Sequence, residues 1–309
     1  MANIVGINDS RPKKSESSGG EADQSDVNNP FLMTGPIKDP RDESFPETIH
    51  INFFPNLKWH SFSLILIYIL VIMFIIQICV DRITEDPSLL QKYFLPVKIT
   101  GPVSRNFVAD YIGIKQRYEV WKFVTSLFIH QNAQFLLSSV LSLLIWTSMF
   151  ERIVKWPRLL IYFILGGILG NIYGLAIVGT GFSFGPTPGI FGIFGGVLGY
   201  LFYNWRNMEN VDGRGMWIFL IVFIFLINII FSDMDSLVYS VTGFVAGVFI
   251  GFCFSEKYLQ KGTIDFGRTS HENVFFVTGI VTLVVLTLIL TLVLFLVTRQ
   301  SPVKPRIEV

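Results

Sequence analysis

Long apolar runs separated by short polar stretches dominate the chain from residue 58 onward. Seven of these runs are each long enough to cross about 30 Å of hydrocarbon as a helix. Their approximate bounds are 60–80, 123–149, 158–178, 186–204, 216–232, 237–255 and 273–297. The second run is longer than a membrane needs, so its first turns are expected in the interfacial layer. The pattern predicts an all-α membrane protein with seven transmembrane helices.

The first 57 residues differ from the rest, because they are rich in Ser, Asp, Glu, Lys, Asn, Gly and Pro. Such a segment cannot bury enough apolar surface to fold alone, so we expect residues 1–57 to be disordered. We divide the remainder into a transmembrane core at 58–256, with a large loop at about 81–120, and a final region at 257–309. That last region holds a linker, the seventh helix and a short tail.

Composition supports a membrane protein. Hydrophobic residues make up 51% of the chain, charged residues 15%, and the mean hydropathy is +0.54. A soluble domain cannot hide that much apolar surface, so the lipid bilayer is the expected environment and partner. The net charge is only +1, and no basic patch with interleaved aromatic residues suggests nucleic acid. We expect neither a metal nor a cofactor.

The positions of Lys and Arg predict the orientation. These residues collect in three connecting segments, 150–157 with its edges, 205–215 and 256–272. The two segments between them, 179–185 and 233–236, carry none. Because cytosolic loops are enriched in Lys and Arg, we expect a cytosolic N-terminus, a lumenal or extracellular C-terminus and a non-cytosolic loop at about 81–120. The expected location is the endomembrane system or the plasma membrane.

Glycine residues mark one face of two of the predicted helices. The run 237–255 carries Gly243, Gly247 and Gly251 at intervals of four residues, and the run 186–204 is similarly rich in glycine. Residues four apart share a helix face, and small residues allow membrane helices to approach closely. We therefore predict that these two helices touch, although glycine is also simply frequent in membrane helices.

Five short motifs occur in a fixed order. They are Glu119-x-Trp121-Lys122-x-x-Thr125-x-x-Phe128-x-His130, then Glu151, Gly167-x-x-Gly170-Asn171, Gly185-Pro186-Thr187-Pro188-Gly189-Ile190-Phe191-Gly192, and Ser240-x-x-Gly243-Phe244-x-x-Gly247. Together they resemble the rhomboid family of intramembrane proteases, over roughly residues 90–255. The resemblance implies a bundle of six transmembrane helices, to which this chain adds a seventh, C-terminal helix.

The resemblance also shows which catalytic positions have changed. In the family a serine on the fourth helix attacks the peptide carbonyl, and a histidine on the sixth helix takes its proton. The matching positions here are Thr187 and Ser240. The two oxyanion partners of the family, a histidine and an asparagine on the second helix, correspond to Phe135 and Ser139.

Other family positions are retained, and the resemblance implies binding or structural roles for them. They are Trp121, Lys122, His130, Glu151, Asn171, Gly185, Gly189, Gly192, Gly243, Gly247 and Gly251. For Asn171 we favour interhelical hydrogen bonding. His130 suits both core hydrogen bonding and a role at the junction of loop and helix. Trp121 and Lys122 suit an interfacial anchor.

A replacement for the missing base is hard to find in the sequence. The histidines are His50, His60, His130 and His271, so none lies between residues 131 and 270. Gly181-Phe182-Ser183-Phe184-Gly185 is a literal Gly-x-Ser-x-Gly, but that motif requires a strand–turn–helix context. Here it joins two predicted membrane helices, and we expect a flexible loop.

Two functions remain open at this point. The first is a rhomboid-like pseudoprotease that binds transmembrane client proteins and affects their trafficking or degradation. The second is an active intramembrane serine-type endopeptidase with a displaced nucleophile or with Thr187 as the nucleophile. A transporter is disfavoured because the chain lacks two similar halves, and no residues support a receptor.

Overall fold

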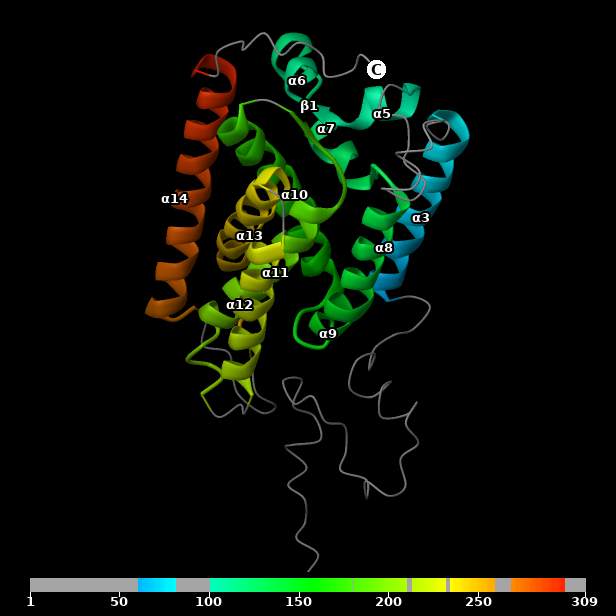
Figure 1. Cartoon of the computed structure of the whole chain (residues 1–309). Helices are drawn as coiled ribbons and strands as arrows, with labels where there is room; N and C mark the ends of the chain where they lie inside the picture. Colours follow the sequence, from blue (N-terminus) through cyan, green and yellow to red (C-terminus); the bar gives the residue numbers. More distant parts are fainter. Residues whose placement is uncertain are drawn as a thin grey trace, which may run out of the picture.

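The structure is a computed structural model that describes residues 61–81, 101–179, 181–209, 213–231, 234–258 and 268–297. The predicted disordered region 1–57 and the tail from residue 298 lie outside the described residues. Within the described residues the long helices run along one common direction and form a bundle (Figure 1). The predicted all-α membrane fold is confirmed.

Each predicted apolar run corresponds to helical structure. The long helices are α3 (Phe62–Asp81), α10 (Trp156–Val178), α11 (Thr187–Tyr203), α12 (Arg214–Phe231), α13 (Met234–Phe254) and α14 (Ser270–Leu292), which continues as the π-helical turn η3 (Val293–Val297). Among the described residues, five helical segments are long and apolar enough to cross a membrane. The apolar parts of α11 and α12 are shorter.

The prediction of one helix over 123–149 is wrong at residues 129–132. The segment divides into α7 (Lys122–Thr125) with the 3-10 turn η1 (Ser126–Phe128), and then α8 (Ala133–Ser142), the π-helical η2 (Leu143–Thr147) and α9 (Ser148–Phe150). The physical reason is Asn132, whose backbone is extended at φ −159° and ψ 170°. Its side chain accepts a hydrogen bond from the backbone N–H of Phe135 at 2.9 Å, so that it caps a new helix.

The described part of the predicted loop is folded. It contains α5 (Pro102–Phe107), the strand β1 (Ala109–Asp110) and α6 (Tyr111–Arg117). Strand β1 pairs antiparallel with β2 (Phe182–Ser183). The expectation of a flexible loop around Ser183 is therefore wrong, because the strand pairing holds this segment in place. We call the end of the bundle that carries these elements the loop face, and the other end the opposite face.

Helix α11 packs against both α10 and α13 through backbone contacts at glycine. A Cβ atom on Gly195 would lie 2.0 Å from the carbonyl oxygen of Phe244, and one on Gly247 would lie 2.3 Å from the carbonyl oxygen of Gly192. On the other side, a Cβ atom on Gly166 of α10 would lie 2.6 Å from the Cα of Gly192. The predicted contact between the two glycine faces is confirmed, and α10 joins it. Such close approach supplies packing energy that lipid cannot.

Candidate functional site

The two dyad positions lie on adjoining parts of α11 and α13. Thr187 is the first residue of α11, and Ser240 is completely buried near the start of α13. Gly243 stands about one turn after Ser240, and a Cβ atom there would lie only 2.3 Å from the carbonyl oxygen of Pro188. Both positions therefore belong to the half of the bundle next to the loop face.

Neither of these two predicted dyad positions carries a general base. The Ser240 hydroxyl donates a hydrogen bond to the Ser236 carbonyl oxygen at 2.9 Å, within its own helix. A general base must accept a proton near neutral pH, which a serine hydroxyl does not do. Pro188, directly after Thr187, lacks a backbone N–H and removes one donor from the start of α11.

The two predicted oxyanion positions, Phe135 and Ser139, offer no free donor. The Phe135 side chain is 45% exposed and has no polar atom. Ser139 is buried, and its hydroxyl donates to the Phe135 carbonyl oxygen at 2.9 Å. The hydroxyl is therefore satisfied within α8 and is not directed at a substrate.

His130 lies in the break between η1 and α8 rather than on a helix. Its backbone N–H donates to Oε1 of Gln77 at 3.1 Å, and its ring meets the edge of Phe74 at 6.2 Å between centroids. Burial lowers the pKa of the imidazole to about 4, against a smaller opposing effect of the Phe128 backbone. His130 is thus a neutral core residue that is also placed at the junction between the loop and α8.

We expect acid to destabilise the fold through His130. Between pH 6.5 and pH 4 the unfolded imidazole binds a proton that the folded one does not, because the pKa falls from 6.5 to about 4 on folding. Stability is therefore fully present above pH 6.5 and is lost as the pH falls. Since one pKa unit corresponds to about 1.4 kcal/mol, the loss can reach about 3 kcal/mol.

The measurement is unfolding in detergent at a series of pH values, for the natural chain and for His130→Phe. If the phenylalanine retains the packing, the two proteins should be similarly stable above pH 6.5, and the natural chain should become less stable than His130→Phe as the pH falls to 4. Glu151 acts in the opposite direction, because burial raises the pKa of its carboxyl group. Glu151 is present in both proteins, so its contribution cancels in the difference between their free energies of unfolding. If the free energies of unfolding of the two proteins change in parallel with pH, the prediction is contradicted.

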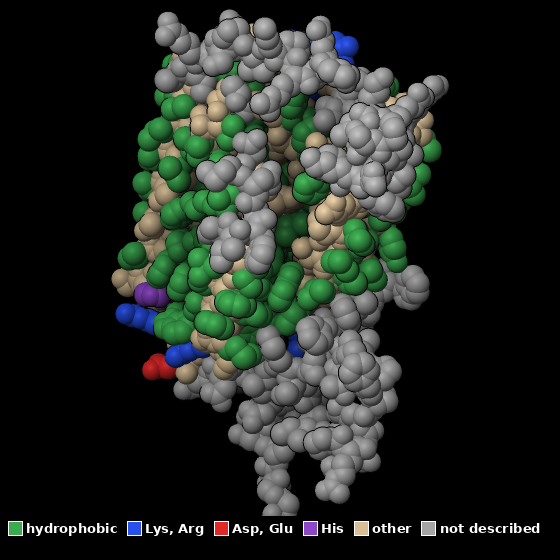
Figure 2. Space-filling model, in the orientation of Figure 1, with side chains coloured by type: hydrophobic (Ala, Val, Ile, Leu, Met, Phe, Trp, Pro, Cys, Tyr) green, Lys and Arg blue, Asp and Glu red, His purple; other side chains and the backbone are tan. Residues whose placement is uncertain are grey.

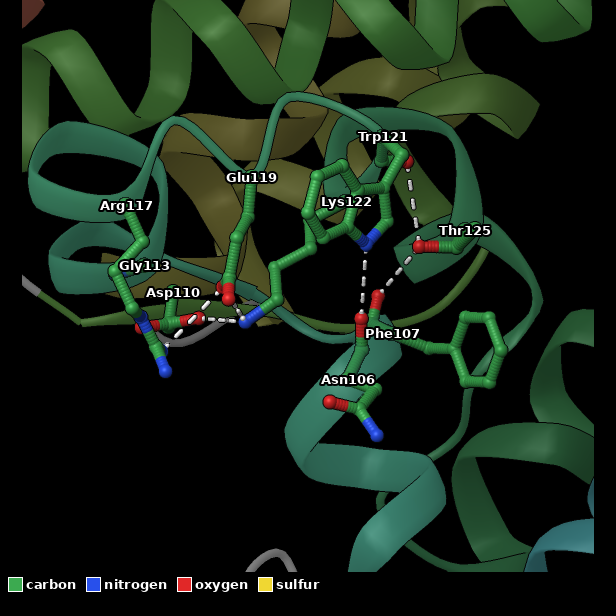
Figure 3. A network of polar contacts seen from close by, with 9 residues as sticks. All are labelled: Asn106, Phe107, Asp110, Gly113, Arg117, Glu119, Trp121, Lys122 and Thr125. Carbon is green, nitrogen blue, oxygen red and sulfur yellow. Dashed lines mark hydrogen bonds and ion pairs between the residues drawn. The ribbon is translucent and has the colours of Figure 1, made fainter.

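A buried ion cluster stabilises the loop face. The Lys122 side chain is only 1% exposed, and its ammonium group contacts Asp110 and, at 2.7 Å, Glu119. Arg117 approaches Glu119 at 3.4 Å and Asp110 at 3.9 Å from the solvent side. Figure 3 shows the two cations directed at the same pair of carboxylates. Asp110 also caps α6, because it accepts a hydrogen bond from the Gly113 N–H at 2.6 Å.

Trp121 and Lys122 therefore have different roles. Trp121 is 52% exposed, in agreement with an interfacial anchor, and its indole N–H donates to the Asn106 carbonyl oxygen at 3.3 Å. The Thr125 hydroxyl donates to the Phe107 carbonyl oxygen at 2.9 Å, so both residues join α7 to α5 (Figure 3). The prediction of Lys122 as an interfacial anchor is wrong, because its charge is neutralised inside the loop.

Asn171 connects three segments of the chain. Its amide nitrogen donates to the Phe123 carbonyl oxygen at 2.9 Å and to the Ser126 hydroxyl at 3.0 Å. Its amide oxygen accepts from the Ser183 hydroxyl at 2.6 Å. The favoured structural role of Asn171 agrees with these bonds. Ser183, the serine of the literal Gly-x-Ser-x-Gly, is buried and serves as a donor to Asn171.

Three further predicted positions have clear structural environments. Glu151 accepts hydrogen bonds from the backbone N–H and the hydroxyl of Ser63, at 2.7 and 2.6 Å, and so caps α3 at the opposite face. Gly185 has φ +79°, a conformation that favours glycine, and its N–H donates to the Ser126 carbonyl oxygen at 2.9 Å. Gly189 makes room for the Phe163 ring, which a Cβ atom would approach to 2.8 Å.

A chain of polar contacts at the end of α3 was not predicted from the sequence. The Asp81 carboxylate accepts from the backbone N–H of Val103 and of Ser104, both at 2.7 Å, and from the Ser104 hydroxyl at 2.6 Å. The Gln77 amide donates to the same hydroxyl at 2.9 Å. One signal was present: Gln77 and Asp81 are spaced four apart at the end of an otherwise apolar run, so they share a helix face.

Comparison with known proteins agrees with this arrangement. Residues 117–260 match the rhomboid domain. The chain is 25% identical over 171 residues to RHOMBOID-like protein 1 of Arabidopsis thaliana, covering 52% of this chain and 43% of that protein. It is 26% identical over 162 residues to Inactive rhomboid protein 1 of Homo sapiens, covering 52% of this chain and 18% of that protein. Inactive rhomboid protein 2 of Homo sapiens is 28% identical over 150 residues, which cover 48% of this chain and 17% of that protein.

Proposed function

Residues 117–260 place this chain in the rhomboid family, and from this premise we propose that it is a rhomboid-like pseudoprotease. In this proposal it binds the transmembrane segments of client proteins and affects their trafficking or degradation. The chain matches less than half the length of each curated relative named above, so the proposal concerns the membrane-embedded core.

The observation that carries the proposal is the pair Thr187 and Ser240. The scaffold around them is intact, with α11 tightly packed against α13, yet neither side chain can take a proton from the other. His130 contacts α3, and His271 lies in the first turn of α14 at the opposite face. Among the described residues, neither histidine is hydrogen-bonded to Thr187 or Ser240. Relatives named as inactive rhomboid proteins support the same conclusion.

We propose that clients approach the bundle between α8 and α12. Figure 2 shows a hollow beside the surface of α8, where small polar side chains and backbone interrupt the apolar surface. Phe135 and Leu141 of α8 are 45% and 48% exposed, and Phe219 and Phe223 of α12 are 66% and 48% exposed. These apolar side chains suit contact with another transmembrane helix as well as with lipid.

The chain is an integral multi-pass membrane protein, and we propose that its opposite face is cytosolic. That end of the helices carries the basic residues Lys155, Arg158 and Lys257. Cytosolic loops are enriched in Lys and Arg, which supports this orientation. The loop face would then be lumenal or extracellular, in the endomembrane system or at the plasma membrane.

The test is proteolysis in liposomes that also contain a single-pass substrate of active rhomboids. Three proteins are compared, namely an active rhomboid, the natural chain and the variant Thr187→Ser, Pro188→Gly, Ser240→His. We expect no cleavage by the natural chain, and partial recovery in the triple variant would show a preserved scaffold. Cleavage by the natural chain that Thr187→Ala abolishes would establish the alternative, a protease with Thr187 as the nucleophile.

The same liposomes test client binding through a photo-crosslinking residue at Leu141 of α8. A matched protein carries that residue at Leu288 of α14, which is 60% exposed. Crosslinks to the transmembrane segment from position 141 and not from position 288 would support client docking. Equal labelling at the two positions would mean random contact in the bilayer, and the client-binding proposal would fail while the conclusion on proteolysis stands.

A further inference from the structure

A short folded segment crosses the loop face between the two outermost helices. Residues 101–118, which we call the strap, contain α5, β1 and α6. In Figure 1, α3 and α14 stand at opposite sides of the bundle, and the strap lies across the end between them. Both of its ends make specific contacts with these helices.

The first attachment joins α5 to the end of α3. Asp81 is 3% exposed and accepts the N–H groups of Val103 and Ser104 and the Ser104 hydroxyl. Hydrogen bonds to a carboxylate are shorter and stronger than those between neutral groups, and these three measure 2.6–2.7 Å. A Cβ atom on Gly101 would lie 2.4 Å from Asp81, so the backbone itself is pressed against this side chain.

The second attachment joins α6 to the end of the seventh helix. Leu294 is completely buried, in a cluster that includes Ala109, Tyr111 and Ile114 of the strap together with Leu175 and Ala176 of α10. The neighbouring ring of Phe295 stacks on Tyr118 at 6.2 Å between centroids, with 13° between the ring planes. Leu294 and Phe295 both belong to η3, where the helix changes to π-helical hydrogen bonding. Such local changes in a helix are frequent at functional positions.

The middle of the strap is stiff. The Val108 N–H donates to the Ser104 carbonyl oxygen at 2.9 Å, β1 pairs with β2, and Asp110 caps α6. The ion cluster around Lys122 holds Asp110 in turn. Because the strap is rigid, each attachment holds the other end of the strap near its binding site. Release of one attachment therefore lowers the effective concentration of the other end at its own site and weakens that contact.

We propose that the strap is a mechanical coupling device, through which the end of α14 and the end of α3 stabilise each other. A lipid or protein that displaces Leu294 from its cluster would loosen the contact between Asp81 and α5. The effect would continue to the start of α8, because Gln77 of α3 accepts the His130 N–H and donates to Ser104. This coupling does not depend on the proposed client binding.

The test is amide hydrogen exchange on the full chain in lipid nanodiscs, with one substitution at each end. Coupling between two sites is reciprocal, so each substitution must act at the far end. Leu294→Ala should accelerate exchange at residues 103–107, and Asp81→Asn should accelerate exchange at residues 293–297, each by about tenfold. The matched controls are Leu296→Ala and Val80→Ala, whose parent side chains are 74% and 48% exposed on the same helices; both should leave the far end unchanged.

Acceleration confined to the substituted end would overturn the proposal, because the two attachments would then be independent. The amides of α11 report global opening. If a variant also accelerates exchange of the α11 amides, the milder variants Leu294→Val and Asp81→Glu replace it in the same experiment. Faster exchange at the far end of the strap, with the α11 amides still protected, supports the coupling proposal. Unchanged exchange at the far end in these variants rejects the proposal.

Discussion

Replacing Gly195 with alanine is expected to destabilise the bundle by about 3 kcal/mol or more, at the upper end of what overpacking costs. The new Cβ atom would lie 2.0 Å from the Phe244 carbonyl oxygen and 2.9 Å from the Val248 backbone nitrogen. Both neighbours are backbone atoms, which cannot rotate away as a side chain can. Helices α11 and α13 must therefore separate, and the adjacent glycine contacts between them are lost as well.

The measurement is unfolding by sodium dodecyl sulfate in mixed micelles, followed by circular dichroism. The matched control is Gly215→Ala in α12, where an added Cβ atom would meet nothing within 4 Å. This control should change stability by no more than about 1 kcal/mol, because alanine is the better helix former. Similar unfolding midpoints for the two variants would show that the contact between α11 and α13 is looser than described.

Replacing Lys122 with methionine is expected to cost about 3–5 kcal/mol, the usual result of removing one partner from a buried ion pair. Methionine can occupy the space of the lysine stem, so the loss is mainly electrostatic. Asp110 and Glu119 would then lie close together without their shared buried cation, and Arg117 reaches them only at 3.9 and 3.4 Å, respectively. Since Asp110 also caps α6, the helix should loosen with the cluster.

The control is Lys155→Met, because the Lys155 side chain is 76% exposed and pairs with Glu256 at 3.4 Å. An exposed ion pair contributes only about 0–1 kcal/mol. A triple variant, Lys122→Met with Asp110→Asn and Glu119→Gln, should regain part of the lost stability, because it removes the repulsion. If Lys122→Met unfolds like Lys155→Met, the cation is not buried in the membrane-bound protein.

The helical architecture could be predicted because lipid imposes a simple requirement on the chain. Every backbone group that crosses the hydrocarbon must be hydrogen-bonded internally, so long apolar runs become helices. The glycine contacts were similarly accessible, since Gly243, Gly247 and Gly251 share one face at their spacing and small residues mark close packing.

The loop face could be predicted much less well. The break before α8 depends on a single side-chain hydrogen bond of Asn132, and the short polar stretch His130-Gln131-Asn132 does not by itself show that the helix ends there. The strands β1 and β2 contain only two residues each, too few to show an alternating pattern. Their pairing joins residues far apart in the sequence, and neither segment would form a strand alone.

The match of Thr187 and Ser240 to the family dyad stays a prediction from the order of the motifs. That order could not show that Ser240 donates to its own helix, or that Lys122 and Asp110 share a buried ion cluster. Such contacts depend on which side chains meet after folding. The same is true of the polar contacts that join Gln77, Ser104 and Asp81.

The unequal lengths of the outer helices have a consequence for the surrounding lipid. Helix α12 has 18 residues, or about 27 Å at 1.5 Å per residue, whereas the apolar segment Ser270–Leu296 has 27 residues, or about 40 Å. Tilting of the longer helix absorbs part of the difference, and local deformation of the bilayer absorbs the rest. Lipid tails beside α12 are then compressed relative to those beside α14. The protein would impose a thickness gradient on its annulus and would favour membranes whose lipids can accommodate both edges at once.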